Sequence, residues 1–259
     1  MRIVLIGAGN LATRLGIALH EKGCTIAQVY SRTEQSAQAL AEKVGATFTC
    51  KISDIVNDAD LYVFSVKDDA LPELLRQMHK NEALWVHTAG SVPMEIFSLH
   101  TENFGVFYPL QTFSKQKEVD FSAIPIYIEA NQPQHLEHLK KLAARLSSQV
   151  IEASSEQRKA LHVAAVFACN FTNHMYAIAA TLLEEKGLHF DQLIPLINET
   201  AVKINTLHPR DAQTGPAVRF DKQVIGRHLE MLEDERLKTI YSLLSESIHE
   251  TAKKRNKDL

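Results

Sequence analysis

The stretch RIVLIGAGNLATRLGIALHEKG, residues 2–23, decides the fold of this chain. It begins with a run rich in isoleucine, valine and leucine, which is typical of a buried strand. Apolar residues at helical spacing follow and indicate a helix from about Asn10 to Lys22, which Gly23 ends. The loop GAGNLA, residues 7–12, joins the two and has the GxGxxA pattern of a dinucleotide-binding strand–loop–helix unit.

Each small residue of this loop has a physical role. Gly7 permits the tight turn, Gly9 lets the backbone approach a pyrophosphate, and Ala12 lets the helix pack closely on the sheet. The free N–H groups and the positive dipole end at the start of the helix favour phosphate. We therefore expect a dinucleotide in contact with Gly7, Gly9, Asn10, Leu11 and Ala12.

The first part of the chain continues this alternation of strands and helices, which predicts a doubly wound α/β domain with a parallel sheet. Helices are expected at 34–44, from 71 and at 134–146. Further strands are expected at 25–30, near 47, and at 61–66, 84–88, 104–108, 124–129 and 149–153.

After about Ser154 the pattern of alternation stops and helical spacing takes over. We expect a Rossmann dinucleotide-binding domain over residues 1–153 and an all-α domain for substrate binding and dimerisation over residues 154–259. Long helices are predicted at 156–186 and 191–207. An irregular stretch at 208–220 and one or two further helices from Asp221 to a polar tail complete the chain.

The composition excludes several classes of partner and site. The net charge is −3, which argues against a nucleic-acid partner. No apolar run approaches the roughly 20 residues that would span a bilayer, so we expect no membrane partner. The three cysteines form no CxxC pair, which argues against a zinc site and favours a reducing, cytoplasmic setting.

The end of the second strand indicates which nicotinamide dinucleotide is bound. NAD-specific domains carry an acidic residue there for the ribose 2′-hydroxyl, and this chain has Ser31, Arg32 and Thr33 instead. Hydroxyl groups and a guanidinium suit a 2′-phosphate, so NADP is the expected cofactor. A solvated arginine at a helix start, in an NAD enzyme, is the alternative.

Two more strand ends fall on the carboxyl edge of the sheet, where ligands bind in open α/β folds. The residues expected beside the adenosine half of the cofactor are Ser65, Val66 and Lys67. At the second strand end, Ala89 and Gly90 would let the nicotinamide ring approach the backbone, and Ser91 is a candidate catalytic residue. His87 is read either as catalytic or as a histidine with a structural partner at the strand end.

The expected helix after residue 155 places Lys159, His162, Asn170 and Asn173 on one face. If that face lines the cofactor cleft, His162 is the candidate general acid or base, because histidine titrates near neutral pH. Lys159 and Asn170 would orient or polarise a carbonyl or imine, and Asn173 would bind substrate. A polar interdomain face with satisfied hydrogen bonds is the alternative.

The segment TGPAVRFD, residues 214–221, contains a turn-forming Gly215-Pro216 pair. Asp221 is placed to cap the helix that follows. Arg219 is a candidate for binding a substrate carboxylate, with a structural Arg–Asp pair as the alternative.

The chain resembles the 6-phosphogluconate-dehydrogenase-like superfamily of NADP oxidoreductases, which includes pyrroline-5-carboxylate reductase and the deazaflavin-dependent NADP reductases. Within it, the chain is most similar to bacterial Rossmann-like proteins whose C-terminal helical domain is classified only as a domain of unknown function. The segments that carry the resemblance are GAGNLA at 7–12, SRT at 31–33, SVKDD at 65–69, HTAGS at 87–91, YPLQTF at 108–113, LHVAAVFACNF at 161–171, TGPAVRFD at 214–221 and RHLEML at 227–232.

This resemblance implies a homodimer joined through the helical domains, and it implies no particular substrate. Tyr108 stands where that family often has histidine, which argues against a proton-transfer role for Tyr108 itself. The hypothesis that follows is an NADP-dependent oxidoreductase that transfers a hydride to or from a small carbonyl, imine or hydroxy compound in the interdomain cleft. The alternative is a dinucleotide-binding sensor or scaffold without turnover.

Overall fold

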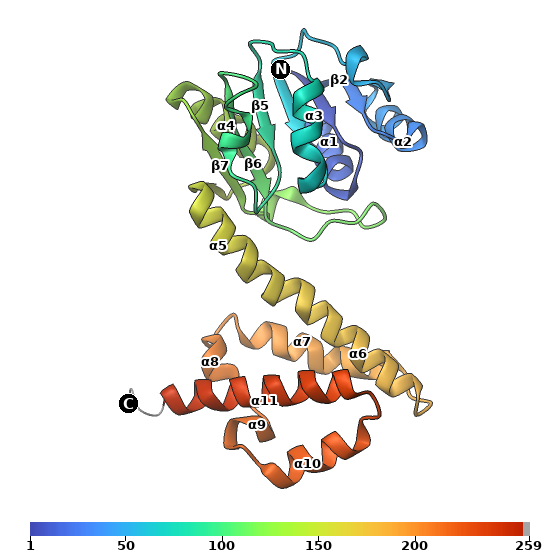
Figure 1. Cartoon of the computed structure of the whole chain (residues 1–259), viewed down its shortest axis with the longest axis vertical. Coiled ribbons are helices and arrows are strands. Elements are labelled where there is room, and N and C mark those ends of the chain that lie inside the picture. Colours follow the sequence, from blue (N-terminus) through green and yellow to red (C-terminus); the bar gives the residue numbers. More distant parts are fainter. Residues whose placement is uncertain (256–259) are drawn as a thin grey trace. The chain divides into compact units, whose positions relative to one another are not determined.

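The computed structural model describes residues 1–255 and forms two compact units, Met1–His174 and Met175–Leu259 (Figure 1). The expected domain boundary, between residues 153 and 154, falls where the last strand of the sheet is followed by helix. The beginning of that helix, as far as His174, groups with the sheet. Residues 256–259, the end of the expected polar tail, lie outside the described residues.

An eight-stranded sheet forms the centre of the first unit, with the strand order β3-β2-β1-β4-β5-β6-β7-β8. All neighbouring strands are parallel except β6 and β7, which are antiparallel. The strands are β1 Arg2–Ile6, β2 Thr25–Tyr30, β3 Thr47–Thr49, β4 Leu61–Phe64, β5 Leu84–His87, β6 Phe104–Pro109, β7 Ile126–Ala130 and β8 Val150–Glu152. The order reverses at β1, and such a switch point opens a crevice at the carboxyl ends of the strands.

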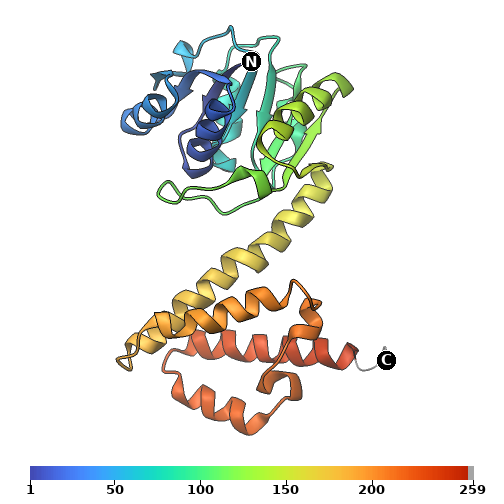
Figure 2. The same cartoon turned by 180° about the vertical axis from the view of Figure 1, so that it is seen from behind.

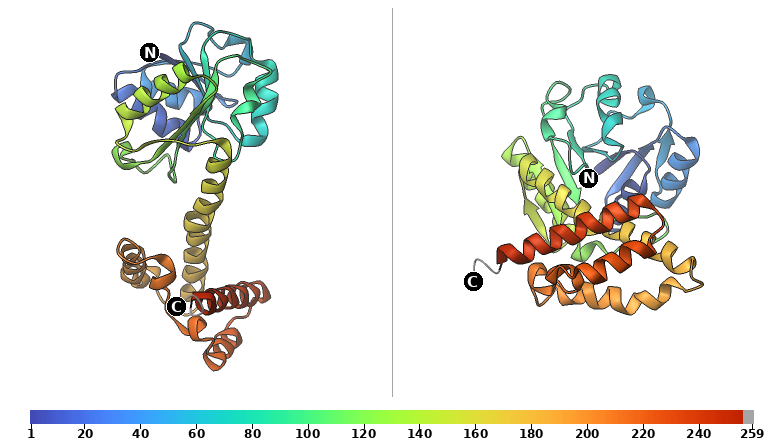
Figure 3. Two further views of the ribbon diagram at one scale, coloured as in Figure 1. Left: turned by 90° about the vertical axis from the view of Figure 1, so that its left-hand side faces the viewer. Right: turned by 60° about the horizontal axis from the view of Figure 1, so that its bottom comes forward.

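Helices cover both faces of this sheet. Helices α1 (Asn10–Glu21), α2 (Glu34–Val44) and α4 (Pro133–Leu146) pack on one face, and their buried leucines join one hydrophobic cluster with β-strand residues (Figure 2). Helix α3 (Leu71–Gln77) packs on the other face within a second cluster, and the left view of Figure 3 shows the two layers edge-on. The doubly wound α/β domain predicted from the sequence is confirmed.

The helix expected at 156–186 is interrupted. It consists of α5 (Ser155–Ala165), a π-helical turn at Val166–Phe171, and α6 (Thr172–Glu184). Its start is fixed by a capping box, in which Ser154 Oγ accepts from the Gln157 N–H and Gln157 Oε1 accepts from the Ser154 N–H. The expected long helix is confirmed over residues 155–184, except that residues 166–171 adopt the wider hydrogen-bonding pattern of a π-helix.

The described part of the second unit is helical, as predicted. The helix expected at 191–207 is a 3₁₀ turn at Phe190–Leu193 followed by a shorter helix, α7. The stretch at 208–220 is not irregular, because a proline at the first turn begins each of the two short helices there. The helices are α7 Ile194–Lys203, α8 Pro209–Ala212, α9 Pro216–Arg219, α10 Lys222–Met231 and α11 Glu235–Arg255.

Asp221 caps α10 as expected, with its Oδ1 accepting from the Val224 N–H at 3.2 Å. Among the described residues, no helix combines the length and the apolar character needed to cross a bilayer.

A buried ion pair ties α5 to the sheet. Arg158, on α5, is 1% exposed, and its Nη1 lies 2.5 Å from Oε2 of Glu129 on β7. The same guanidinium donates to the carbonyl oxygens of Ala89 and Val92, in the loop after β5. Glu129 also accepts hydrogen bonds from the backbone N–H and the hydroxyl of Ser155, both at 2.8 Å. One network therefore joins the start of α5, a strand and a loop at the carboxyl edge.

His87 is the last residue of β5, and its ring packs against Phe97 in the second hydrophobic cluster. Its Nδ1 accepts from the Ala89 N–H at 3.2 Å, so the neutral ring carries its proton on Nε2. Burial, with a smaller contribution from the nearby charge of Arg158, lowers the pKa of His87 to about 3. The side chain is therefore neutral at physiological pH, which favours the structural interpretation of His87 over the catalytic one.

Removal of the Arg158 guanidinium should destabilise the protein strongly. Arg158→Met leaves Glu129 without its counter-ion and the carbonyl groups of Ala89 and Val92 without the donors that Arg158 supplies, so we expect a loss of about 3–5 kcal/mol in the free energy of unfolding. Urea denaturation measures it. Lys159→Met is the matched control, because the neighbouring Lys159–Glu156 pair is exposed and should contribute at most about 1 kcal/mol. Equal losses in the two variants would contradict the role given to Arg158.

Acid should destabilise the protein partly through His87. The unfolded chain binds a proton at His87 below about pH 6.5, while the folded protein does not until about pH 3. The stabilisation is complete above pH 6.5 and falls by about 1.4 kcal/mol per pH unit as the pH drops toward 3. Urea denaturation between pH 7 and pH 4 should show a shallower dependence for His87→Asn, whose amide oxygen can still accept the Ala89 N–H. The same pH dependence in both proteins would refute the assignment.

Candidate functional site

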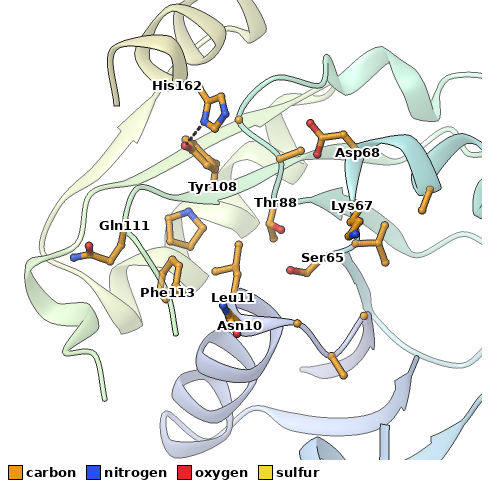
Figure 4. Close-up of a pocket in the computed structure, with 18 of the residues that line it drawn as sticks. Asn10, Leu11, Ser65, Lys67, Asp68, Thr88, Tyr108, Gln111, Phe113 and His162 are labelled. Atoms are coloured by element: carbon orange, nitrogen blue, oxygen red, sulfur yellow. Dashed lines mark hydrogen bonds between the residues drawn. The ribbon is translucent and has the colours of Figure 1, made fainter. Parts of the chain in front are cut away.

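A pocket of about 1610 Å³ opens at the carboxyl edge of the sheet (Figure 4). It is larger than the roughly 300–1,000 Å³ of a pocket for a single small ligand, so it has room for a dinucleotide and a substrate together. All of its lining residues belong to the first unit. Most of them come from the glycine loop, the ends of β2, β4, β5 and β6, the loop after β6, and the helical segment 161–170. The others come from the start of α2, the short helical turn after β3, and the segment 70–77 that includes α3.

The glycine loop forms the phosphate end of the pocket. Gly7 has φ +117°, and a Cβ there would lie 2.2 Å from the Ser65 carbonyl oxygen, so only glycine fits. A Cβ on Gly9 would meet nothing within 4 Å, which leaves open space beside the backbone at the start of α1. Asn10 and Leu11 line this space, whereas Ala12 is fully buried in the core. The loop therefore fits a pyrophosphate group.

The part of the pocket around the ends of β2 and β4 contains most of the residues expected beside adenosine. Ser31 and Arg32 line the pocket at the end of β2, and Thr33 lies outside the lining, directly before α2. The expected residues after β4 that line it are Ser65, Val66 and Lys67. Residues that sequence reasoning missed in this part of the pocket are Ser36, Ile52, Ala70, Glu73, Leu74 and Gln77.

The loop after β5 lines the next part of the pocket through Ala89 and Gly90, as predicted. Ser91 is outside the lining but donates a hydrogen bond to Oδ2 of Asp68, which does line the pocket. The Asp68 carboxylate therefore holds the Ser91 hydroxyl next to the pocket, a pairing that the sequence analysis did not anticipate.

The helical segment 161–170 forms one wall of the pocket. It contains some of the expected catalytic residues, and others lie outside the pocket lining. His162 and Asn170 line the pocket. Lys159 does not, and its ammonium lies 3.0 Å from Oε1 of Glu156. Asn173 is exposed and follows the π-helical turn, which changes the angular spacing that a regular α-helix would give. Arg219 is exposed in the second unit, at the end of α9.

Tyr108 is a pocket residue to which the sequence analysis gave no role. Its hydroxyl lies 3.1 Å from Nδ1 of His162, as the dashed line in Figure 4 shows. Burial raises the pKa of the Tyr108 phenol, so the hydroxyl stays protonated at neutral pH. The position of Tyr108 near the end of a strand parallel to β5 could have indicated its place at the carboxyl edge.

The loop after β6 was also missed as a wall of the pocket. Leu110, Gln111, Thr112, Phe113 and Lys115 all line it. Arg14, on α1, holds this loop through hydrogen bonds from Nε to the Ser114 carbonyl oxygen at 3.0 Å and from Nη2 to the Lys115 carbonyl oxygen at 2.6 Å.

Among residues 1–255, no three histidine, cysteine or acidic side chains come together as metal ligands. The polar groups that the pocket presents beside the loop after β5 are the imidazole of His162, the phenol of Tyr108 and the carboxamide of Asn170.

Two family models match the chain. The model described as NADP oxidoreductase, coenzyme F420-dependent, matches residues 2–88, and a domain of unknown function, DUF2520, matches residues 124–248. No curated protein matches the chain.

Solved structures resemble the whole chain. A Bacteroides fragilis protein described as a candidate NADP oxidoreductase is 54% identical, with 96% of this chain and 98% of that chain covered and a TM-score of 0.91. A Thermotoga maritima protein is 22% identical, with 97% and 99% covered and a TM-score of 0.80. An imine reductase from Myxococcus stipitatus in complex with NADP⁺ is 16% identical, with 100% and 95% covered and a TM-score of 0.69. The last two share the fold.

These similarities confirm the resemblance stated from the sequence, including the helical C-terminal domain of unknown function. The chain belongs to the NADP oxidoreductase family of the Bacteroides fragilis protein, in which a Rossmann-like domain precedes a DUF2520 domain.

Proposed function

We propose that the protein transfers a hydride between NADP(H) and a small carbonyl, imine or hydroxy substrate in the pocket of the first unit. The observation that carries this proposal is the convergence, in one cavity, of a phosphate-binding loop, Arg32 and the His162–Tyr108 pair. The family model supports NADP as the cofactor. The imine reductase named above supports an imine as one of the substrate classes.

The residues present fit NADP along its length. The backbone N–H groups around Gly9 would bind the pyrophosphate, and Arg32 with Ser31 would bind the 2′-phosphate. Ala89 and Gly90 present backbone without large side chains, which allows a flat ring to approach. When bound, the nicotinamide supplies or accepts the hydride.

His162 would give a proton to the substrate oxygen or nitrogen during reduction and take it back during oxidation. Asn170 lines the same wall and would orient the polar group of the substrate. Ser91, paired with Asp68, is a second candidate for contact with that group. Arg219 remains a candidate for a substrate carboxylate, and the pocket gives no role to Lys159 or Asn173.

We also propose that the protein is a cytoplasmic homodimer joined through its helical domain. The support for the dimer is the number of large apolar side chains that the second unit exposes, since monomeric proteins rarely leave such residues clustered in water. Leu196, Val202, Met231 and Leu243 are each at least 60% exposed. The three cysteines are free thiols, which agrees with a reducing compartment.

Loss of the Arg32 guanidinium should weaken the binding of NADPH selectively. Charge-assisted hydrogen bonds to the 2′-phosphate contribute about 1.5–3 kcal/mol, so we expect Arg32→Ala to raise the Kd for NADPH about 10- to 100-fold. The Kd for NADH, which lacks that phosphate, should barely change. Calorimetry with NADP⁺, NADPH, NAD⁺ and NADH measures this, and Lys43→Ala, an exposed cation on α2 outside the pocket, is the control.

The result also discriminates between the functions considered. Scarcely any change in cofactor affinity on Arg32→Ala would point to an NAD enzyme, and no binding of any of the four by the wild-type protein would overturn the oxidoreductase proposal. With binding established, NADPH absorbance is followed with a panel of small ketones, aldehydes and cyclic imines. Tight NADPH binding without turnover of any of them would favour a dinucleotide sensor.

Introduction of a charge on the apolar surface of α11 should weaken the dimer. We expect Leu243→Glu to raise the dimer dissociation constant at least about tenfold, because a carboxylate without a partner would be buried in the interface. Sedimentation equilibrium measures it. Leu99→Glu is the control, since Leu99 is 82% exposed in the first unit. A monomeric wild-type protein, or an equal effect of the two substitutions, would contradict the proposal.

A further inference from the structure

We infer that Tyr108 is a positioning residue for His162, whose imidazole it holds in one orientation through every protonation state of a catalytic cycle. This inference rests on the proposed function for its chemical purpose, but the contact on which it depends can be tested without a substrate.

The ring of His162 is held on two sides by different parts of the chain. On one side the Tyr108 hydroxyl, from β6, lies 3.1 Å from Nδ1, and the two rings meet at 70° with their centroids 6.2 Å apart. On the other side is Gly90, where a Cβ would lie 2.5 Å from Nδ1 and 2.6 Å from Cγ of His162. The ring therefore packs against bare backbone, and the phenol hydrogen bond decides its orientation.

The use of Nδ1 by Tyr108 leaves Nε2 for a ligand. Within residues 1–255, Nε2 of His162 has no hydrogen-bond partner, and His162 lines the cavity. The nitrogen that faces a substrate is thus set by a residue that need not touch the substrate.

A phenol suits a histidine that gains and loses a proton. In the imidazolium form both ring nitrogens carry protons, and the Tyr108 oxygen accepts from Nδ1–H. In the neutral form with the proton on Nε2, the Tyr108 hydroxyl donates to Nδ1 instead. A carboxylate or carbonyl group could only accept, so it would favour one tautomer. Burial keeps Tyr108 in the protonated form that this exchange needs, although the charge of Arg158 opposes that effect.

The step balances with the hydride of the proposed cofactor and one proton from water. During reduction a bound NADPH would supply the hydride with the electron pair of the C–H bond that it loses, which forms the new C–H bond, and would become NADP⁺. The former π pair of the C=O or C=N group then takes the Nε2 proton of the imidazolium. The electron pair of the broken N–H bond stays on Nε2, and the neutral ring still donates from Nδ1 to Tyr108. A proton from water restores the imidazolium.

The test is a ¹⁵N NMR measurement of the histidine rings at pH 8.5, where free histidine is neutral. In the wild-type protein we expect the Nδ1 resonance of His162 to be shifted by its hydrogen bond with the Tyr108 hydroxyl, whether Nδ1 donates or accepts. Within residues 1–255 the Tyr108 hydroxyl has no other partner, so Tyr108→Phe should abolish that shift. His162→Gln identifies the signal.

Tyr127→Phe is the matched control. Tyr127 lies opposite Tyr108 in the β6–β7 register, with the ring centroids 6.5 Å apart, but has no hydrogen bond to His162. An unchanged Nδ1 resonance in Tyr108→Phe, or an equal change in Tyr127→Phe, would overturn the inference. Thermal melting of both variants checks that the fold is retained.

Failure of this inference is distinguishable from failure of the proposed function. If Tyr108→Phe changes the His162 signals while the wild-type protein binds no dinucleotide, the pairing is real and the oxidoreductase proposal fails. If NADPH binds and is turned over while the signals stay unchanged, the oxidoreductase stands and Tyr108 has no positioning role. Where a substrate is found, Tyr108→Phe should lower kcat about 10- to 100-fold with the Kd for NADPH unchanged.

Discussion

The buried pair of Arg158 and Glu129 is the interaction on which the functional end of the first unit depends. The guanidinium reaches the carboxylate on β7 and two carbonyl groups of the loop after β5, and so it connects three segments distant in sequence. A buried charge without its partner destabilises the folded protein. Loss of this ion pair would therefore disturb the positions of all three segments. His162 lies one helical turn further along α5, so its position over Gly90 follows from the same network.

At two places in the pocket, the backbone of a glycine lies very close to a neighbouring group. Gly7 lies against the Ser65 carbonyl and Gly90 against the His162 ring, and in both places a Cβ would overlap the neighbouring group. Two glycines thus set the shape of the pocket at two places. Arg32 and Tyr108 come from strand ends that the sheet aligns at one edge.

Sequence reasoning could find the parts of the site that are encoded locally. The glycine loop, Arg32 and the residues after β4 and β5 each follow a strand, so their location at the carboxyl edge follows from the fold class alone. Tyr108 and Arg14 could not be assigned in this way, because their roles depend on contacts with residues 54 and about 100 positions away. Asn173 lies outside the pocket lining for another reason. The shared face of Lys159, His162, Asn170 and Asn173 was predicted on a regular helix, and no pattern in the sequence indicated the π-helical turn at 166–171.

The hydrogen bonds of Arg14 have a consequence for the walls of the pocket. Helix α1 begins at the phosphate-binding loop, and through Arg14 it also carries the loop that walls the opposite side of the cavity. The guanidinium therefore joins α1 to the backbone around Ser114 and Lys115, so a displacement of either segment would be passed to the other. The start of α1 and the loop after β6 are thus coupled parts of one cavity, although about 100 residues separate them in the sequence.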